Sequence, residues 1–104
     1  MVEVNLKEYA KLLINNTKTD QYVWEQMGDS KYRLLLRKGT VVLEKYKSSS
    51  TTFFELSFYD TAALIYKSNI FTNNSVYQDY LELYNTIISK NNEKINSAIS
   101  DLFS

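Results

Sequence analysis

Serine, threonine, lysine, aspartate and glutamate are the side chains left to do chemistry, because histidine and cysteine are absent from the 104 residues. That absence removes the commonest general base, the commonest thiol nucleophile and the usual zinc ligands. A serine–lysine nucleophile would have to come from the run Ser48 to Thr52, which lies near Lys45 and Lys47. Such a nucleophile needs a buried lysine with a lowered pKa. A serine-rich run beside charged residues indicates an exposed loop instead.

Paired carboxylates are the second candidate chemistry. Asp79 and Glu82 are three residues apart in a predicted helix, and Glu93 and Asp101 follow later. Acid–base catalysis needs two carboxyl groups in a cleft, at least one of them with a raised pKa. All four residues lie off the apolar stripes of that region, so we predict that they are solvated. We therefore expect no catalytic residue and no enzymatic activity.

A metal site in this chain would have to use oxygen ligands alone, which suits calcium or magnesium. The ligand spacing of an EF-hand loop is absent. The two glycines, Gly28 and Gly39, are too few and too far apart to form a phosphate-binding loop. We expect no metal, no cofactor and no small-molecule substrate.

Charge is distributed unevenly along a chain whose twelve basic and twelve acidic residues balance. The segment Lys31–Lys47 holds six basic residues and one acid, Glu44. Strand alternation places Lys31, Arg33, Arg37 and Tyr46 on the outer face of a predicted sheet, with Arg33 opposite Glu44. One interpretation is a basic, aromatic face that binds single-stranded nucleic acid by stacking and phosphate contacts. The other, which we favour, is that charged strands keep the sheet soluble and its edges unpaired.

Aromatic residues are abundant, with nine Tyr, five Phe and one Trp. Those at helical spacing are predicted to lie in or beside the core, whereas the faces of Trp24 and Tyr59 depend on strand parity. Aromatic and arginine side chains are the usual anchors of protein interfaces. The sequence therefore predicts a partner-binding sheet face that contains Trp24, Arg33, Arg37, Tyr46 and Tyr59.

Two changes of hydrophobic period define the elements that must position these residues. A first helix is predicted from Leu6 to Asn16, with Asn5 and Glu8 as a capping box. A period of two then predicts five antiparallel strands at Tyr22–Met27, Lys31–Arg37, Thr40–Tyr46, Phe53–Tyr59 and Leu64–Lys67.

The register of the second and third strands depends on their turn. A two-residue turn at Lys38–Gly39 pairs Leu36 with Val41 and Leu34 with Leu43. Lysine is a poor first residue for a type I′ turn, so a longer loop with a shifted register is the alternative.

Helical spacing returns after Ser75, which forms a second capping-box pattern with Gln78. Asn91–Asn92 either separates two helices or lies within one long helix. Two apolar stripes follow: Tyr77, Tyr80, Leu81, Tyr84, Ile87 and Ile88, and then Ile95, Ala98, Ile99, Leu102 and Phe103. We expect the second stripe to close the core, with pairing to its twin in a homodimer as the alternative.

Together these elements predict one α+β domain over residues 1–104. It consists of an N-terminal helix, a five-stranded antiparallel meander, and a C-terminal helix or helix pair packed on one sheet face. No apolar run approaches the roughly 20 residues that span a bilayer, and the start of the chain lacks a signal-peptide core. A cytoplasmic protein without membrane partners is the expectation.

The order of several landmarks resembles a known group of proteins. These landmarks are Trp24 after a polar link, Tyr32, the Phe53–Asp60 strand with its turn, and the pattern Leu81-x-x-Tyr84. They resemble a loose group of small, uncharacterised proteins of low-G+C Gram-positive bacteria and their mobile elements. Glycines that are common in that group are replaced here within Thr19-Asp20 and Thr61-Ala62. The resemblance implies a small accessory protein and assigns no site residues.

We therefore expect a non-enzymatic protein-interaction or regulatory accessory module, encoded by a bacterium, a phage or a mobile element. Its partner would be another protein or a second copy of itself. Single-stranded nucleic-acid binding through the basic, aromatic sheet face is the alternative.

Overall fold

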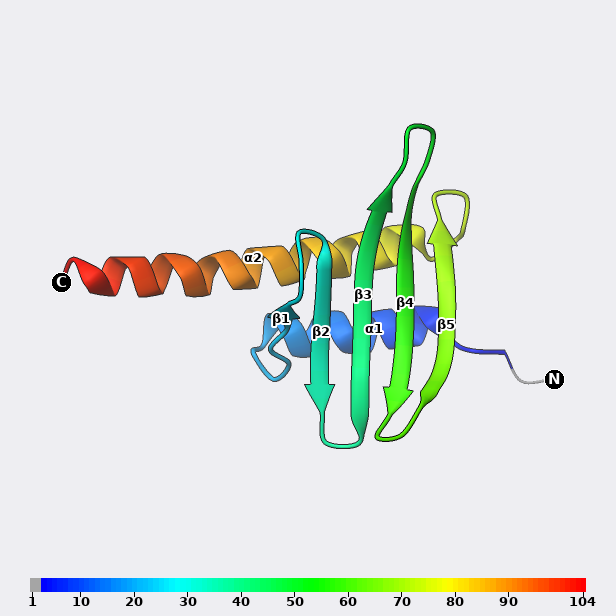
Figure 1. Ribbon diagram of the computed structural model, residues 1–104, viewed down its shortest axis with the longest axis horizontal. Coiled ribbons are helices and arrows are strands. Elements are labelled where there is room, and N and C mark those ends of the chain that lie inside the picture. Colours follow the sequence, from blue (N-terminus) through cyan, green and yellow to red (C-terminus); the bar gives the residue numbers. More distant parts are fainter. Residues whose placement is uncertain (1–2) are drawn as a thin grey trace.

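Residues 3–104 are described by a computed structural model, in which one helix precedes and one helix follows the five strands of a single sheet along the chain. The elements are α1 (Leu6–Lys18), β1 (Glu25–Gln26), β2 (Lys31–Leu36), β3 (Gly39–Lys47), β4 (Thr52–Asp60), β5 (Leu64–Phe71) and α2 (Tyr77–Leu102). All neighbouring strands are antiparallel and lie in chain order, and both helices run behind the same face of the sheet (Figure 1). The predicted α+β meander is confirmed.

Helix α1 begins where predicted and ends two residues later than predicted. The Oδ1 atom of Asn5 accepts a hydrogen bond from the backbone N–H of Glu8 at 3.2 Å, which caps the first turn. After Lys18 the backbone turns through Asp20, whose φ of 63° lies in the left-handed region. Aspartate tolerates that conformation better than most residues, so the chain can reverse here without a glycine.

The first predicted strand, Tyr22–Met27, is present only as the two-residue β1. Trp24 lies just before it, and its side chain is 3% exposed. The indole Nε1–H donates a hydrogen bond of 2.9 Å to Oγ1 of Thr17, and that hydroxyl donates one of 2.6 Å to the carbonyl of Leu13. Trp24 therefore connects this segment to α1. The interpretation that places Trp24 on the outer sheet face is wrong.

The β2–β3 hairpin is shifted by two residues from the register based on a Lys38–Gly39 turn. The turn consists of Arg37 and Lys38, and Gly39 pairs with Leu36 as the first residue of β3. Leu34 consequently lies opposite Val41. A Cβ on Gly39 would overlap the backbone carbonyl oxygen of Tyr59, so the close approach of β3 to β4 requires glycine inside the strand. A shift of two residues leaves every side chain on its predicted face.

The β4–β5 hairpin extends further than predicted, because β5 continues from Lys67 to Phe71. Its turn is held by Asp60, whose Oδ1 accepts backbone hydrogen bonds from Ala62 and Ala63 at 2.8 and 2.9 Å. These two hydrogen bonds lower the pKa of Asp60, because they stabilise the charged carboxylate.

Helix α2 is one continuous helix of 26 residues, so Asn91–Asn92 does not interrupt it. The predicted capping box of Ser75 and Gln78 is wrong. The Oδ1 atom of Asn74 accepts from the backbone N–H of Val76 at 3.0 Å, and Val76 precedes the first turn without a side-chain cap. An asparagine side chain can bond to the backbone two residues later, so Asn74, and not Ser75, makes the side-chain contact before α2.

The core lies between the inner face of the sheet and the two helices. Fully buried side chains from the strands and α2 form one cluster with α1: Ala10, Leu34, Leu43, Phe54, Leu56, Ile70, Tyr80, Leu83 and Ile87. Burial of one such leucine, isoleucine or phenylalanine contributes roughly 1.5–3 kcal/mol. The first predicted helical stripe thus faces the core, with Leu81 and Ile88 partly buried at its edge. The second stripe does not: Ile95, Ile99, Leu102 and Phe103 are exposed. The expectation that this second stripe closes the core is wrong.

Trp24→Phe is expected to lower the free energy of unfolding by about 1–3 kcal/mol, because Thr17 loses its donor and the smaller ring leaves a gap. Thr17→Val removes the same bond, so the double variant should cost about 1 kcal/mol less than the two single variants together. Thr86→Val is the matched control, since the Thr86 hydroxyl donates to the Glu82 carbonyl of its own helix at 2.8 Å. Urea unfolding gives the free energy of unfolding of all four variants. If the losses caused by Trp24→Phe and Thr17→Val simply add in the double variant, the two side chains do not share a stabilising hydrogen bond.

Tyr80→Phe is expected to lower the free energy of unfolding by about 1 kcal/mol at neutral pH, because the buried hydroxyl donates to the Leu6 carbonyl at 2.7 Å. Burial raises the pKa of Tyr80 above its ordinary value of 10.0. This contribution is therefore fully present below that value, and it is lost as the pH rises through the higher folded pKa. Urea midpoints measured into the alkaline range should fall less steeply in the variant than in the natural chain. Equal alkaline slopes would contradict this account, and Tyr59→Phe is the exposed control.

Candidate interaction face

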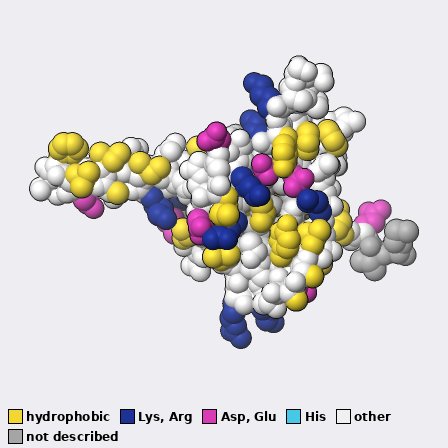
Figure 2. Space-filling view, in the orientation of Figure 1, with side chains coloured by type: hydrophobic (Ala, Val, Ile, Leu, Met, Phe, Trp, Pro, Cys, Tyr) yellow, Lys and Arg dark blue, Asp and Glu magenta, His cyan; other side chains and the backbone are white. Residues whose placement is uncertain are grey.

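The outer face of the sheet is not covered by either helix, and we call it the open face. Its side chains alternate along the strands with those of the core, and they surround a shallow hollow of about 670 Å³. Figure 2 shows this face toward the viewer, with charged side chains interleaved across its middle and hydrophobic ones toward both ends. These side chains include Lys31, Arg33, Leu35, Val42, Glu44, Tyr46, Phe53, Glu55, Tyr59, Leu64, Lys67 and Phe71.

Three ion pairs, which we call the ionic band, cross the middle of the open face. Nη2 of Arg33 lies 2.9 Å from an oxygen of Glu25 on β1. The Nζ atom of Lys67 lies 3.4 Å from Glu55, and that of Lys31 lies 3.9 Å from Glu44. Each cation of the band therefore has a carboxylate beside it.

The predicted positive character of this face is accordingly wrong, and so is the predicted pairing of Arg33 with Glu44. Glu25 comes from β1 and Glu55 from β4, so two of the three neutralising carboxylates lie outside the basic segment Lys31–Lys47. Lys45 points to the other side of the sheet, where its Nζ lies 5.5 Å from the centre of the Tyr84 ring. The net charge of a sequence segment therefore does not describe the face to which it contributes.

Arg33 is the best anchored cation of the open face. Its side chain is 35% exposed, and its Nε is buried without a hydrogen-bond partner among residues 3–104. An unmatched buried donor carries a free-energy cost.

At the end of the sheet next to the β3–β4 turn, Tyr46, Phe53 and Phe71 form an aromatic row. The Tyr46 and Phe53 rings are stacked with centroids 5.1 Å apart, and Phe53 and Phe71 are 4.8 Å apart. The Tyr46 hydroxyl donates to a carboxylate oxygen of Glu44 at 2.9 Å, and this hydrogen bond raises the pKa of Tyr46. Tyr46 and Phe71 remain 36% and 41% exposed, so the row presents aromatic surface to a partner.

The opposite end of the open face lies next to the β2–β3 and β4–β5 turns. It carries a second apolar row, which we call the turn-end row. Register places Leu35 beside Thr40, Thr40 beside Tyr59, and Tyr59 beside Leu64. Leu35, Tyr59 and Leu64 are all exposed. The open face therefore has apolar surface at both ends and ion pairs between them.

Three of the five predicted site residues lie on the open face, namely Arg33, Tyr46 and Tyr59. Arg37 lies in the β2–β3 turn, exposed beyond the turn-end row, and Trp24 is in the core. Residues that the prediction missed are Leu35, Phe53, Leu64 and Phe71. Strand parity carried from Arg33 and Tyr46 to their neighbours would have found Leu35 and Phe53. It would not have found Phe71, which lies beyond the predicted end of β5, or Leu64, which a β-bulge at Tyr59 shifts by one residue.

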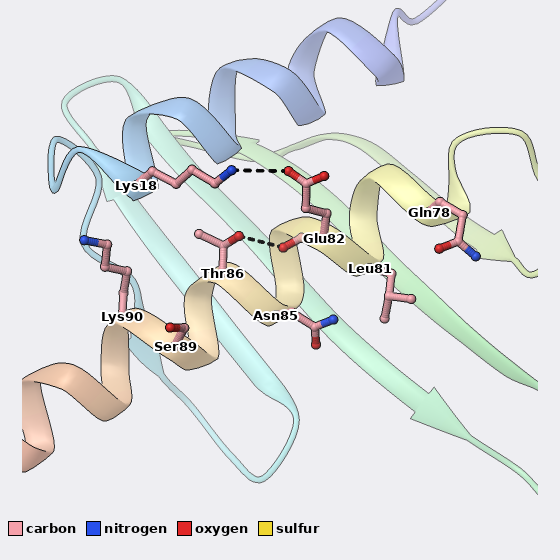
Figure 3. A pocket seen from close by; sticks show the side chains of 8 residues that line it. All are labelled: Lys18, Gln78, Leu81, Glu82, Asn85, Thr86, Ser89 and Lys90. Atoms are coloured by element: carbon pink, nitrogen blue, oxygen red, sulfur yellow. Dashed lines mark hydrogen bonds and ion pairs between the residues drawn. The ribbon is translucent and has the colours of Figure 1, made fainter.

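A second hollow, of about 580 Å³, lies on the outer side of the helices (Figure 3). Lys18 of α1 reaches across it to Glu82 of α2, with 3.6 Å between Nζ and the carboxylate. Both side chains are more than half exposed, so this pair is solvated and weak. The remaining lining residues are Gln78, Leu81, Asn85, Thr86, Ser89 and Lys90. This set offers amides and hydroxyls but no enclosed acid–base pair.

The carboxylates examined for catalysis are dispersed over the surface. Asp79 lies 3.4 Å from Lys7, and Glu93 lies 3.7 Å from Lys90. Across residues 3–104, no three acidic side chains come together in a way that could hold a metal ion. Neither helix in this part of the chain is both long and apolar enough to cross a membrane.

Comparison with known proteins provides no analogy for the open face. No family model matches the chain, and no similar curated protein or solved structure was found. Functional inference therefore rests on the geometry and chemistry of the open face itself.

Proposed function

We propose that this protein is a non-enzymatic interaction module whose open face binds a protein partner. The observation that carries the proposal is the arrangement of exposed aromatic and aliphatic rows on either side of a neutralised ionic band. Tyrosine and arginine at the centre of a contact commonly supply much of its binding free energy, and phenylalanine is enriched in the cores of interfaces. The exposed turn residue Arg37 extends the same surface.

The charges of the open face favour a protein over a nucleic acid as partner. Binding to phosphates requires cations that are free to replace counterions. On the open face, Lys31, Arg33 and Lys67 each lie beside a carboxylate. A protein surface of mixed charge could exchange ion pairs with this band, whereas a nucleic acid would meet Glu25, Glu44 and Glu55 there.

Location and origin belong to the same proposal. A chain without cysteine is compatible with the reducing cytoplasm. The order of landmarks in the sequence supports a bacterial or mobile-element accessory protein. In this proposal the module acts in the cytoplasm, where it binds a larger protein or a second copy of itself.

Photo-cross-linking in cells that naturally carry the gene tests which face of the protein contacts the partner. A benzophenone amino acid at Tyr46 and another at Leu64 should yield an adduct of the same mass, because both positions lie on the open face. The same probe at Gln78 or Asn85, on the exposed side of α2, should not yield that adduct. Adducts from α2 alone, or none from the open face, would contradict the proposal.

The nucleic-acid alternative has its own measurement. Fluorescent single-stranded oligonucleotides should show no change in anisotropy with the protein at low salt. A salt-sensitive affinity, lost in Tyr46→Ser and Phe71→Ser, would replace the protein partner with a nucleic acid.

A charge exchange between Arg33 and Glu25 tests the role of Arg33 in partner binding separately from its role in stability. Arg33→Glu places two acids together and should lower the free energy of unfolding by up to about 1 kcal/mol. Glu25→Arg combined with Arg33→Glu should restore stability, because the pair is remade with opposite polarity. The exchanged variant should nevertheless lose the Tyr46 cross-link. An undiminished cross-link would show that Arg33 does not contact the partner.

A further inference from the structure

The last twelve residues of the chain extend α2 away from the body of the molecule, and we call residues 93–104 the projecting segment (Figure 1). All of them are exposed. A helix of this length is only marginally stable on its own, although here it continues a helix that is docked on the sheet. Its exposed apolar side chains are the remaining part of the stripe that forms the core earlier in α2.

The apolar side chains of the projecting segment follow the spacing of a helix–helix contact. Ile95, Ala98 and Leu102 continue a seven-residue repeat that includes Leu81, Tyr84 and Ile88 in the docked half. Ile95 is 50% exposed, and Leu102 is 80% exposed. Figure 2 shows hydrophobic side chains gathered along this end of the molecule. The docked half of the repeat has a partner in the chain's own core, but the projecting half has none among residues 3–104.

Charge complementarity indicates what covers this stripe. Lys94 and Asp101 are seven residues apart, so they lie on one flank of the stripe, and neither forms an ion pair within residues 3–104. If two copies pair in antiparallel orientation about a point between residues 97 and 98, Lys94 of each copy lies near Asp101 of the other. A parallel pair gives neither residue an opposite charge. The segment is therefore self-complementary in one orientation only.

A hollow at the base of the projecting segment fits the same arrangement. It has a volume of about 280 Å³ and is lined by Trp24, Glu25, Gln26, Asn91, Lys94 and Ile95. In the antiparallel register, Leu102 and Phe103 of one copy lie opposite residues 92 and 93 of the other. This register brings the exposed end of each helix to the hollow of its partner, where Ile95 is the exposed apolar residue.

We propose that the projecting segment is a self-association site, in which two copies pair antiparallel through Ile95, Ala98, Ile99 and Leu102. Twelve residues on each side are fewer than the 20–30 of a standard stable interface. The dimer is therefore weak, with a dissociation constant roughly in the micromolar to millimolar range. The open face stays uncovered in this dimer, so two copies of it are presented together and partner binding gains in avidity.

Sedimentation equilibrium over protein concentrations from micromolar to millimolar tests the proposal on the full chain. The natural chain should shift from monomer to dimer. Ile99→Asp should weaken the dimer at least tenfold with unchanged circular dichroism, because Ile99 is exposed in the monomer. Ser97→Glu, on the other side of the helix, should have no effect. A monomer throughout, or a dimer unaffected by Ile99→Asp, would overturn the proposal.

The orientation of the two paired helices is tested by charge exchange and by single cysteines introduced into a chain that has none. Lys94→Glu should weaken the dimer several-fold, and the exchange of Lys94→Glu with Asp101→Lys should restore it. Ala98→Cys, next to the two-fold axis, should form a disulfide-linked dimer on mild oxidation, whereas Leu102→Cys should not. Faster linkage through Leu102→Cys, or no rescue by the charge exchange, would reject the antiparallel pairing.

Discussion

Two helices in a chain of this length cover one face of a five-stranded sheet, and the other face must be stable in water or against a partner. Strand alternation sends Leu34, Leu43 and Leu56 to the helices and sends Arg33, Glu44 and Glu55 to the opposite face. The whole molecule depends on this division. The buried face supplies the hydrophobic free energy of folding, and the exposed face keeps its charges neutral by pairing them across strands.

The same division explains how a mostly polar chain combines stability with binding surface. The Trp24–Thr17 hydrogen bond and the Tyr80–Leu6 hydrogen bond both connect α1 to other parts of the chain from the buried side. They hold the helix layer without using any group of the open face. Exposed aromatic residues such as Tyr46 and Phe71 are consequently not needed for the core. Their stacking across β3, β4 and β5 gives a rigid apolar surface that loses little side-chain entropy when it is covered.

Local pattern was sufficient for the architecture, because the hydrophobic period changes from 3.6 to 2 and back along the chain. It was insufficient where a distant contact decides the outcome. Gly39 lies within β3, where the backbone of Tyr59 leaves no room for a side chain, and no property of the Arg37–Gly39 sequence reveals that close approach. Trp24 is buried in the core, where Thr17 of α1 accepts a hydrogen bond from its indole N–H. The ionic band likewise depends on carboxylates from β1 and β4, so the charge of one segment could not predict it. Arg33, Tyr46 and Tyr59 were found because parity within a strand is local information.

The most direct test of an uncovered sheet face is solvent paramagnetic relaxation of the tyrosine ring signals in a dilute NMR sample. Tyr46 and Tyr59 are 36% exposed, whereas Tyr80 is fully buried and Tyr84 is 6% exposed. The rings of Tyr46 and Tyr59 should therefore relax strongly with a soluble paramagnetic agent, and those of Tyr80 and Tyr84 should relax weakly. Protection of Tyr46 and Tyr59 equal to that of Tyr80 would mean that this face is already covered in the free chain, and would contradict the account.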